Sequence, residues 1–324
     1  MIPGIEQRHV VTRDGTRIGY QVRGTRGPCV VLANGLGGTY LAFRYLYEAL
    51  GDYRTICWDY RGLYSSSAPA DPHANTVAHQ VDDLAEILDH EGIDAAVIAG
   101  WSMGVQVGFE TIRRHRARVR GLLAINGTYG RAFRTVLGSR LIGQTIPMLL
   151  KIIRAQAGLV GRATRMVAGS QALITAMIRA GLVSPKIDQE VFREVAAGFQ
   201  TVDLRIYSDL LTRLDEHDAE AVLDTIDVPV SIVTGDSDLM TPPATAERLH
   251  RAIAGSRLVV IEGGTHYTPV EYPAILVDEL GRLLDRVPGW ERPCPARRAT
   301  RRCWTSTCAA PRAVRRSAPA ARIA

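Results

Sequence analysis

The amino-acid sequence predicts an α/β fold, in which a mostly parallel, doubly wound sheet of about eight strands carries an inserted helical cap. Short apolar runs, most of them ending in Gly or Asn, are typical of strands that are buried on both faces. Helical patterns lie between most of these runs, and such alternation favours parallel strands with helices on both faces. The runs are CVVLAN (29–34), TICWDY (55–60), DAAVIAG (94–100), GLLAIN (121–126), VPVSIVTG (228–235) and RLVVIEGG (257–264).

The chain begins with a predicted hairpin, since HVVTRDGTRIGYQV (9–22) reads as two alternating strands around an Asp14-Gly15 turn. Residues 127–225 contain no convincing strand and instead show amphipathic helices, broken at Pro147, Gly158 and Pro185. We therefore divide the chain into a core (1–126 and 226–288), a helical cap (127–225) and a tail (289–324). The helices expected within the core span 40–50, 76–92, 103–115, 242–254 and 273–287.

The charge of the chain is concentrated in its tail. The 324 residues are 46% hydrophobic and carry a formal net charge of +6. Residues 290–324 contain nine arginines and one glutamate, which leaves residues 1–289 with a net charge of −2. The tail is rich in Arg, Ala, Pro, Ser and Thr without periodicity, so it is predicted to be disordered. Nucleic-acid binding through this tail is a minor alternative, and no nucleic-acid partner is expected.

Cysteine usage and the N-terminus favour a cytoplasmic protein. Cys29 and Cys57 lie in apolar runs, and no C-x-x-C or paired Cys/His spacing indicates a metal or redox site. The N-terminal MIPGIEQRHV lacks the basic and apolar regions of a secretory leader. No window approaches the ~18 uninterrupted apolar residues of a membrane span.

A serine between two glycines marks the candidate site. In AGWSMGVQVGFE (99–110), Ser102 follows a buried strand and precedes a helix, a setting in which flanking glycines permit a tight turn. A serine hydroxyl is a poor nucleophile until a base takes its proton. His266, in the glycine-rich loop GGTHYTPVEYP after the last core strand, is the predicted base.

The histidine in turn needs a carboxylate that fixes its tautomer. The segment VTGDSDLMTPP (233–243) directly after a core strand supplies Asp236 and Asp238, of which Asp238 is favoured and Asp236 remains the alternative. The loop after GLLAIN offers Asn126 and no nearby acid, which disfavours a carboxylate at that strand.

The order Ser102, Asp238, His266 closely resembles the α/β-hydrolase family over about residues 8–288. DYRGLYSS (59–66), DDLAEILDHEGI (82–93) and GDSDLMTP also match that family's pattern. The resemblance implies an oxyanion hole formed by the backbone N–H groups of Leu36 and Met103. Two positions depart from the family pattern, because Asn34 stands where a histidine is usual and Tyr64 where a glycine is usual. The candidate substrate-binding residues are Asn34, Tyr64, Trp101 and Tyr267.

These features predict a serine hydrolase that cleaves a hydrophobic carboxylic ester through an acyl-enzyme, with water as the acyl acceptor. Neither a metal nor an organic cofactor is required by this chemistry. The apolar segments IPMLLKII and ALITAMI of the cap suggest an apolar acyl or alkyl group, although the same residues equally suit packing of the cap. The alternatives are an acyltransferase or thioesterase with the same triad, and a small-molecule receptor of low turnover on the same fold.

Overall fold

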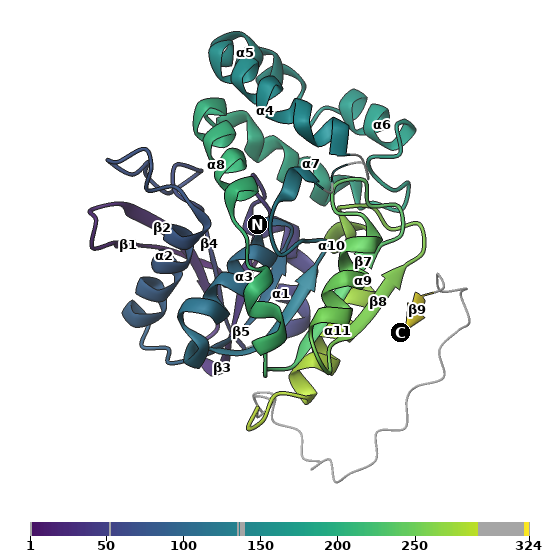
Figure 1. The fold of residues 1–324 in the computed structure, drawn as a ribbon. Helices are drawn as coiled ribbons and strands as arrows, with labels where there is room; N and C mark the ends of the chain where they lie inside the picture. Colours follow the sequence, from purple (N-terminus) through teal and green to yellow (C-terminus); the bar gives the residue numbers. More distant parts are fainter. Residues whose placement is uncertain (1, 52, 135, 137–139, 291–320, 324) are drawn as a thin grey trace.

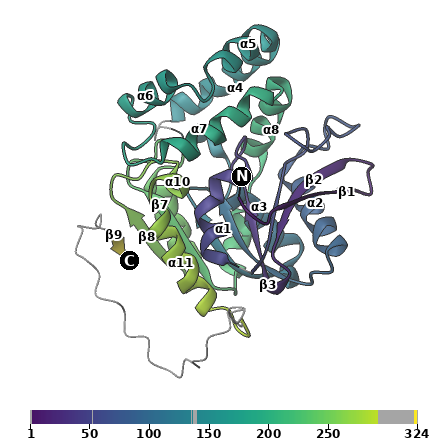
Figure 2. The ribbon, with the colours of Figure 1, turned by 180° about the vertical axis from the view of Figure 1, so that it is seen from behind.

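The computed structural model of the chain is built around one mixed sheet (Figures 1 and 2). It describes residues 2–51, 53–134, 136, 140–290 and 321–323. In these residues nine strands follow the order β1-β2-β4-β3-β5-β6-β7-β8-β9; the six from β4 to β8 are parallel, and β1, β2 and β9 pair antiparallel. The strands are β1 (Glu6–Val11), β2 (Arg17–Arg23), β3 (Arg26–Ala33), β4 (Tyr53–Trp58), β5 (Ala96–Trp101), β6 (Val119–Ile125), β7 (Val230–Gly235), β8 (Arg257–Ile261) and β9 (Ala321–Ile323).

Helices cover both faces of this sheet. Alternate residues of each central strand point to opposite sides, so Val31 packs in one apolar cluster while Val30 and Leu32 pack in the other. One cluster takes residues from α2, α3 and α9, and the other from α1 and α11. These helices are α1 (Arg44–Leu50), α2 (Val77–His90), α3 (Met103–Arg114), α9 (Pro243–Ala252) and α11 (Pro273–Asp285). The predicted doubly wound α/β class is confirmed.

The cap segment between β6 and β7 is helical and lies above the carboxyl ends of the parallel strands (Figure 1). The predicted break at Pro147 is wrong, since α4 continues through this exposed proline. Proline removes one helical hydrogen bond, but the amphipathic packing of a long helix can outweigh that loss. The helices are α4 (Arg140–Ala155), α5 (Ala157–Val167), α6 (Gln171–Arg179), α7 (Gln189–Gly198) and α8 (Leu204–Glu216), with short 3₁₀ turns η3 (Ala132–Arg134), η5 (Phe199–Thr201) and η6 (Glu220–Thr225).

The C-terminal end of the chain differs in part from the disordered tail predicted for 289–324. Ala321–Ile323 forms β9, which pairs with β8, and Trp290 stacks on Tyr53 with ring centroids 5.6 Å apart. β8 is the last of the parallel strands, and the backbone groups along its outer edge can form hydrogen bonds with any extended segment. Residues 291–320 and 324, which hold most of the predicted tail, lie outside the described residues. Within the described part of the chain, no helix has both the length and the apolar character needed to cross a bilayer.

A buried ion pair fixes the loop after β4. The guanidinium of Arg61 donates from Nε and Nη2 to both carboxylate oxygens of Asp83 on α2, at 2.7 and 2.6 Å, and from Nη1 to Asp14 in the hairpin turn. The side chains of Arg61 and Asp83 are 3% and 0% exposed. Burial raises the pKa of Asp83 to about 6, although Arg61 opposes this shift.

We predict that Arg61→Met lowers the free energy of unfolding by about 3–5 kcal/mol at neutral pH, because Asp83 remains buried without its partner. Arg61 lowers the pKa of Asp83, so its removal should raise this pKa above the wild-type value of about 6. Protonated Asp83 needs no counter-charge, so the loss should shrink as the pH is lowered from alkaline values to about 6 and change little below that. Urea unfolding at several pH values measures this. Arg282→Met, which removes an exposed pair with Asp278, is the matched control and should change the free energy of unfolding little. Equal effects of the two substitutions would contradict the prediction.

Candidate active site

Ser102 stands at a sharp turn between β5 and α3. Its φ of +56° is in the left-handed region, which a serine occupies only when its surroundings enforce it. The glycines on either side of it permit the close approach of backbones: an added Cβ would lie 2.3 Å from the Gly104 carbonyl oxygen at Gly100, and 2.0 Å from the Ala33 carbonyl oxygen at Gly104. The turn therefore presents the Ser102 side chain at the carboxyl edge of the sheet.

His266 and Asp238 meet Ser102 at this edge. His266 lies after β8 and Asp238 after β7, so adjacent parallel strands deliver both side chains. The Nε2 atom of His266 is 2.9 Å from Ser102 Oγ, and its Nδ1 atom is 2.9 Å from Asp238 Oδ2. His266 is 6% and Asp238 2% exposed, whereas Ser102 is half-buried. The three residues thus form one continuous hydrogen-bonded chain that reaches the surface at the serine.

The carboxylate of Asp238 is held in its charged form. Its Oδ1 accepts the backbone N–H groups of Met240 and Thr241 at 2.8 and 2.9 Å, and its Oδ2 accepts the Thr241 hydroxyl at 2.7 Å. Burial alone would raise the pKa of Asp238, but the neighbouring His266 and the bonds from Thr241 outweigh burial and lower this pKa below its usual value. Asp238 is therefore ionised throughout the neutral range.

Asp236, the alternative acid, points elsewhere. It is exposed, and its Oδ1 accepts the backbone N–H of Gly263 and the hydroxyl of Ser237, both at 2.9 Å. These bonds tie the loop after β7 to the loop after β8. The geometry thus assigns Asp236 to loop structure and brings only Asp238 to the histidine.

Asn126 is a site residue that the sequence interpretation set aside. It follows β6 with a φ of +45° and is 1% exposed. Its Nδ2 donates to Asp238 Oδ2 at 2.8 Å and to the Thr265 carbonyl oxygen at 3.1 Å, and its Oδ1 accepts the hydroxyl of Thr268. One amide therefore holds the acid and both sides of the His266 loop. Its position at the carboxyl end of a core strand is the signal that could have found it.

We predict that Asn126→Ala lowers kcat by about 10- to 100-fold with little change in KM. A hydrogen bond to a charged group contributes ~1.5–3 kcal/mol, and its loss here lets Asp238 and His266 drift from alignment. Steady-state kinetics on a soluble ester measures the split between the two constants. A rise in KM at constant kcat would contradict this positioning role.

Trp101 and Tyr267 flank the catalytic histidine candidate. Trp101 is buried, and its Nε1 donates to the His266 carbonyl oxygen at 2.8 Å. The ring of Tyr267 lies 5.9 Å from the rings of both Trp101 and His266. Trp101 therefore supports the His266 loop, while half-buried Tyr267 forms part of the wall beside it.

The turn after β3 packs against the serine. A Cβ at Gly35 would lie 3.2 Å from Ser102 Cβ, which places the Asn34–Gly38 turn next to Ser102. The buried side chain of Asn34 donates to Cys57 Sγ at 3.1 Å, and the backbone carbonyl oxygen of Asn34 accepts the Tyr60 hydroxyl at 2.6 Å. Half-buried Tyr64 donates to the Gly37 carbonyl oxygen. In this structure Asn34 and Tyr64 brace the turn, and Leu36 lies within it.

The cap supplies aromatic side chains over this turn. A Cβ at Gly37 would lie 2.8 Å from Phe199 and 3.0 Å from Tyr207, and these two rings pack edge-to-face at 4.9 Å. Phe192 of α7 packs in the same way on Tyr267 at 5.1 Å. Aromatic side chains of the cap therefore pack on the turn after β3, which lies next to Ser102, and on Tyr267 of the His266 loop.

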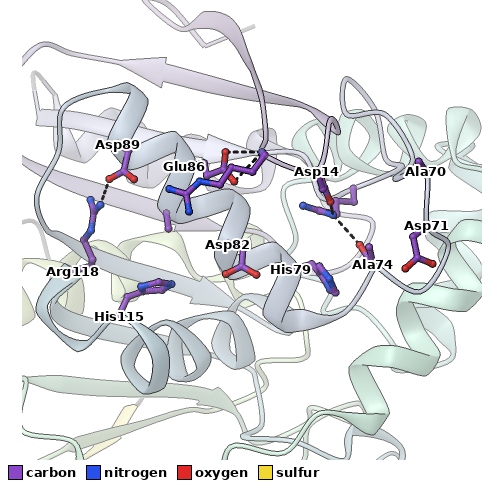
Figure 3. A pocket seen from close by; sticks show the side chains of 13 residues that line it. Asp14, Ala70, Asp71, Ala74, His79, Asp82, Glu86, Asp89, His115 and Arg118 are labelled. Carbon is purple, nitrogen blue, oxygen red and sulfur yellow. Dashed lines mark hydrogen bonds and ion pairs between the residues drawn. The ribbon is translucent and has the colours of Figure 1, made fainter.

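A polar cleft of about 630 Å³ lies away from these residues, between the hairpin turn, α2 and the loop after β4 (Figure 3). Opposite charges along it neutralise one another, as in the pairs Arg118–Asp89 and Arg61–Asp14. None of the predicted site residues lines it.

Comparison with known proteins agrees with the fold. A model of the alpha/beta hydrolase family matches residues 30–279. The chain belongs to this family. This family match confirms the resemblance to the α/β-hydrolases that the sequence motifs predicted.

Two kinds of relative of this α/β-hydrolase are informative. A pimeloyl-[acyl-carrier protein] methyl ester esterase of Neisseria meningitidis is 31% identical over 193 residues, which span 60% of this chain and just under two thirds (66%) of that relative. Among solved structures, the esterase RhEst1 from Rhodococcus sp. ECU1013 has a TM-score of 0.69 at 23% identity, covering 87% of this chain and 99% of that one. An enol-lactonase from Burkholderia xenovorans LB400 has a TM-score of 0.67 at 22% identity, covering 86% and 100%. At these identities the two structures show the shared fold.

Proposed function

We propose that this α/β-hydrolase cleaves a carboxylic ester with a hydrophobic acyl group, with Ser102 as nucleophile, His266 as general base and Asp238 as its acid partner. The observation that carries the proposal is the unbroken chain of two 2.9 Å contacts from Ser102 Oγ through His266 to Asp238 Oδ2. The esterase name of the Neisseria relative supports the choice of ester over other acyl compounds.

The geometry supports a two-step acyl transfer. His266 Nε2 takes the hydroxyl proton while Ser102 Oγ attacks the ester carbonyl, and charged Asp238 stabilises the resulting imidazolium. The imidazolium then protonates the departing alcohol, which leaves an acyl-serine. A water deprotonated by His266 attacks the acyl carbon and releases the acid and the free serine.

The oxyanion of each tetrahedral intermediate needs hydrogen-bond donors. Met103 is the first residue of α3, so its N–H group has no acceptor within the helix. Leu36 lies in the turn that packs on Ser102. We assign the oxyanion hole to these two backbone N–H groups; each such donor is typically worth ~10²–10³ in rate.

The substrate class follows from the walls of the site. Tyr267 and Trp101 from the core lie beside His266, and Phe199 and Tyr207 from the cap pack on the turn next to Ser102. Burial of an acyl chain against such rings is favourable in proportion to its apolar area. We therefore propose a medium-sized hydrophobic acyl group, with water as the acceptor.

Acyl-enzyme formation tests this proposal. Rapid mixing of the enzyme with p-nitrophenyl esters of increasing chain length should release a burst of p-nitrophenol that approaches one equivalent whenever deacylation is slower. Mass spectrometry of the quenched protein should locate the added acyl group on Ser102. Labelling of another residue, or hydrolysis without any serine adduct across the series, would refute the mechanism.

The second candidate uses the same triad as an acyltransferase, whose acyl acceptor is an alcohol or thiol in place of water, or as a thioesterase, whose leaving group is a thiol. Ser102 is half-buried next to the turn on which Phe199 and Tyr207 pack, and restricted access of bulk water there favours an acceptor other than water. Partition of the acyl group between water and added alcohols or thiols detects an acyltransferase, and rates on matched esters and thioesters distinguish a thioesterase from an esterase.

A further inference from the structure

The outer layer of the cap has an unusual surface. Large apolar side chains on α4 and α5 point to solvent, although soluble proteins keep contiguous patches of this kind small. The exposed fractions of these side chains range from 46% to 83%; the residues are Met148, Leu149, Ile152, Leu159, Met166 and Val167. We call them, with the exposed cations Lys151, Arg162 and Arg165, the α4–α5 face.

Helical spacing mixes the two residue types on the same side of each helix. Met148 and Ile152 are one turn apart on α4, with Lys151 between them in the sequence. On α5, Leu159, Arg162 and Met166 follow at intervals of three and four residues. Both helices lie at the end of the molecule farthest from the sheet (Figures 1 and 2), so this face is unobstructed by the core.

The charged side chains in the first part of the cap, residues 127–187, are all basic. Residues 127–187 contain nine Lys or Arg and no Asp or Glu, whereas residues 188–220 contain nine acidic and three basic residues. Arg154 of α4 is neutralised by Asp209 of α8, within the cap. Among the described residues, no ion pair involves Lys151, Arg162 or Arg165. The cations that remain unpaired therefore accompany the exposed apolar side chains.

We propose that the α4–α5 face docks on an anionic phospholipid surface. Helices that lie in a membrane interface combine an apolar face with Lys and Arg, which attract anionic headgroups while the apolar side chains enter the acyl boundary. A second copy of this chain is a poor occupant, because two such faces would bring cations against cations. Long, flexible Met and Leu side chains at the outermost end of the cap suit a fluid, extended surface.

Sedimentation with lipid vesicles tests the proposal on the full chain. Vesicles of phosphatidylcholine alone are compared with vesicles that also contain phosphatidylglycerol. Since residues 290–324 carry nine arginines of their own, binding to anionic vesicles by the wild type does not decide the question. The decision rests on substitutions in the α4–α5 face, with the C-terminal segment left intact.

Two multiple variants are expected to weaken binding to the anionic vesicles. Lys151→Gln/Arg162→Gln/Arg165→Gln removes three cations, each worth about 5-fold near an anionic surface, so the affinity should fall about 100-fold. Met148→Ser/Met166→Ser, at 69% and 83% exposed positions, should reduce it about 10-fold or more. Val11→Ser and Arg251→Gln, exposed positions elsewhere, are the matched controls and should bind as the wild type does.

The proposal requires both variants to lose affinity. It is overturned if the wild type does not sediment with the mixed vesicles, if either variant retains wild-type affinity, or if the face binds only an acidic protein. Thermal unfolding of each variant, followed by circular dichroism, checks that the fold is intact. The vesicle result does not depend on the proposed ester chemistry, so the two proposals fail separately.

Discussion

Replacing Ser102 with alanine should lower kcat for ester hydrolysis by about 10⁴-fold or more. Within the hydrogen-bonded chain, the Ser102 hydroxyl is the group free to attack a carbonyl. Both ring nitrogens of His266 are engaged, Nε2 with Ser102 Oγ and Nδ1 with Asp238 Oδ2. Without the hydroxyl, the histidine has no nucleophile except a misplaced water, and residual catalysis comes from the oxyanion donors alone. Steady-state assays with a p-nitrophenyl ester series compare the two proteins directly.

Ser237→Ala is the matched control for this substitution. Ser237 is an exposed serine in the loop that carries Asp238, but its hydroxyl donates to Asp236 and points away from the histidine. We expect its activity to stay within about twofold of the wild type. A folded Ser102→Ala protein with substantial esterase activity would exclude the triad mechanism. A wild type that is inactive on every ester, yet binds them, would favour the low-turnover receptor.

The parts of the site that depend on local sequence could be predicted without the structure. Gly100 and Gly104 are required because backbones pass within contact distance of their missing side chains, and that demand leaves a readable pattern around Ser102. Parallel strands buried on both faces are equally legible, so the loops that carry Asp238 and His266 could be placed at one edge of the sheet.

Features that depend on tertiary contacts were not accessible in this way. Asn126 bonds to residues more than a hundred positions away, and an asparagine at the end of a strand carries no local mark of that role. Pro147 lies inside α4 because packing outweighs its local preference. Ala321–Ile323 pairs with β8 through backbone groups, which any sequence provides. The aromatic contacts of Phe199 and Tyr207 over Gly37 likewise depend on how the cap is seated.

Asp238→Asn should lower kcat by about 10⁴-fold while leaving the fold intact, and Asp236→Asn should leave it within about twofold. The contacts of Asp238 explain the first expectation. Its Oδ1 accepts two backbone N–H groups, from Met240 and Thr241, so the single oxygen of an asparagine would take that position. The asparagine NH₂ would then stand at the place of Oδ2 and donate to His266 Nδ1.

A histidine that accepts at Nδ1 carries its proton on Nε2 and cannot take the proton of Ser102. The NH₂ group at that place cannot accept the Asn126 Nδ2–H, so the substituted enzyme loses this hydrogen bond and also holds the histidine in the wrong tautomer. The tautomer defect lowers kcat far more than the single lost hydrogen bond lowers stability to thermal unfolding. The same substitution at Asp236 removes charge from an exposed carboxylate whose bonds, from Gly263 N–H and the Ser237 hydroxyl, an asparagine oxygen can also accept. Comparable losses in both variants would show that the acid role is shared, and a loss confined to Asp236→Asn would transfer it there. The two substituted aspartates lie two positions apart in the same loop. The assignment of the acid therefore rests on which carboxylate faces His266, and not on position in the sequence.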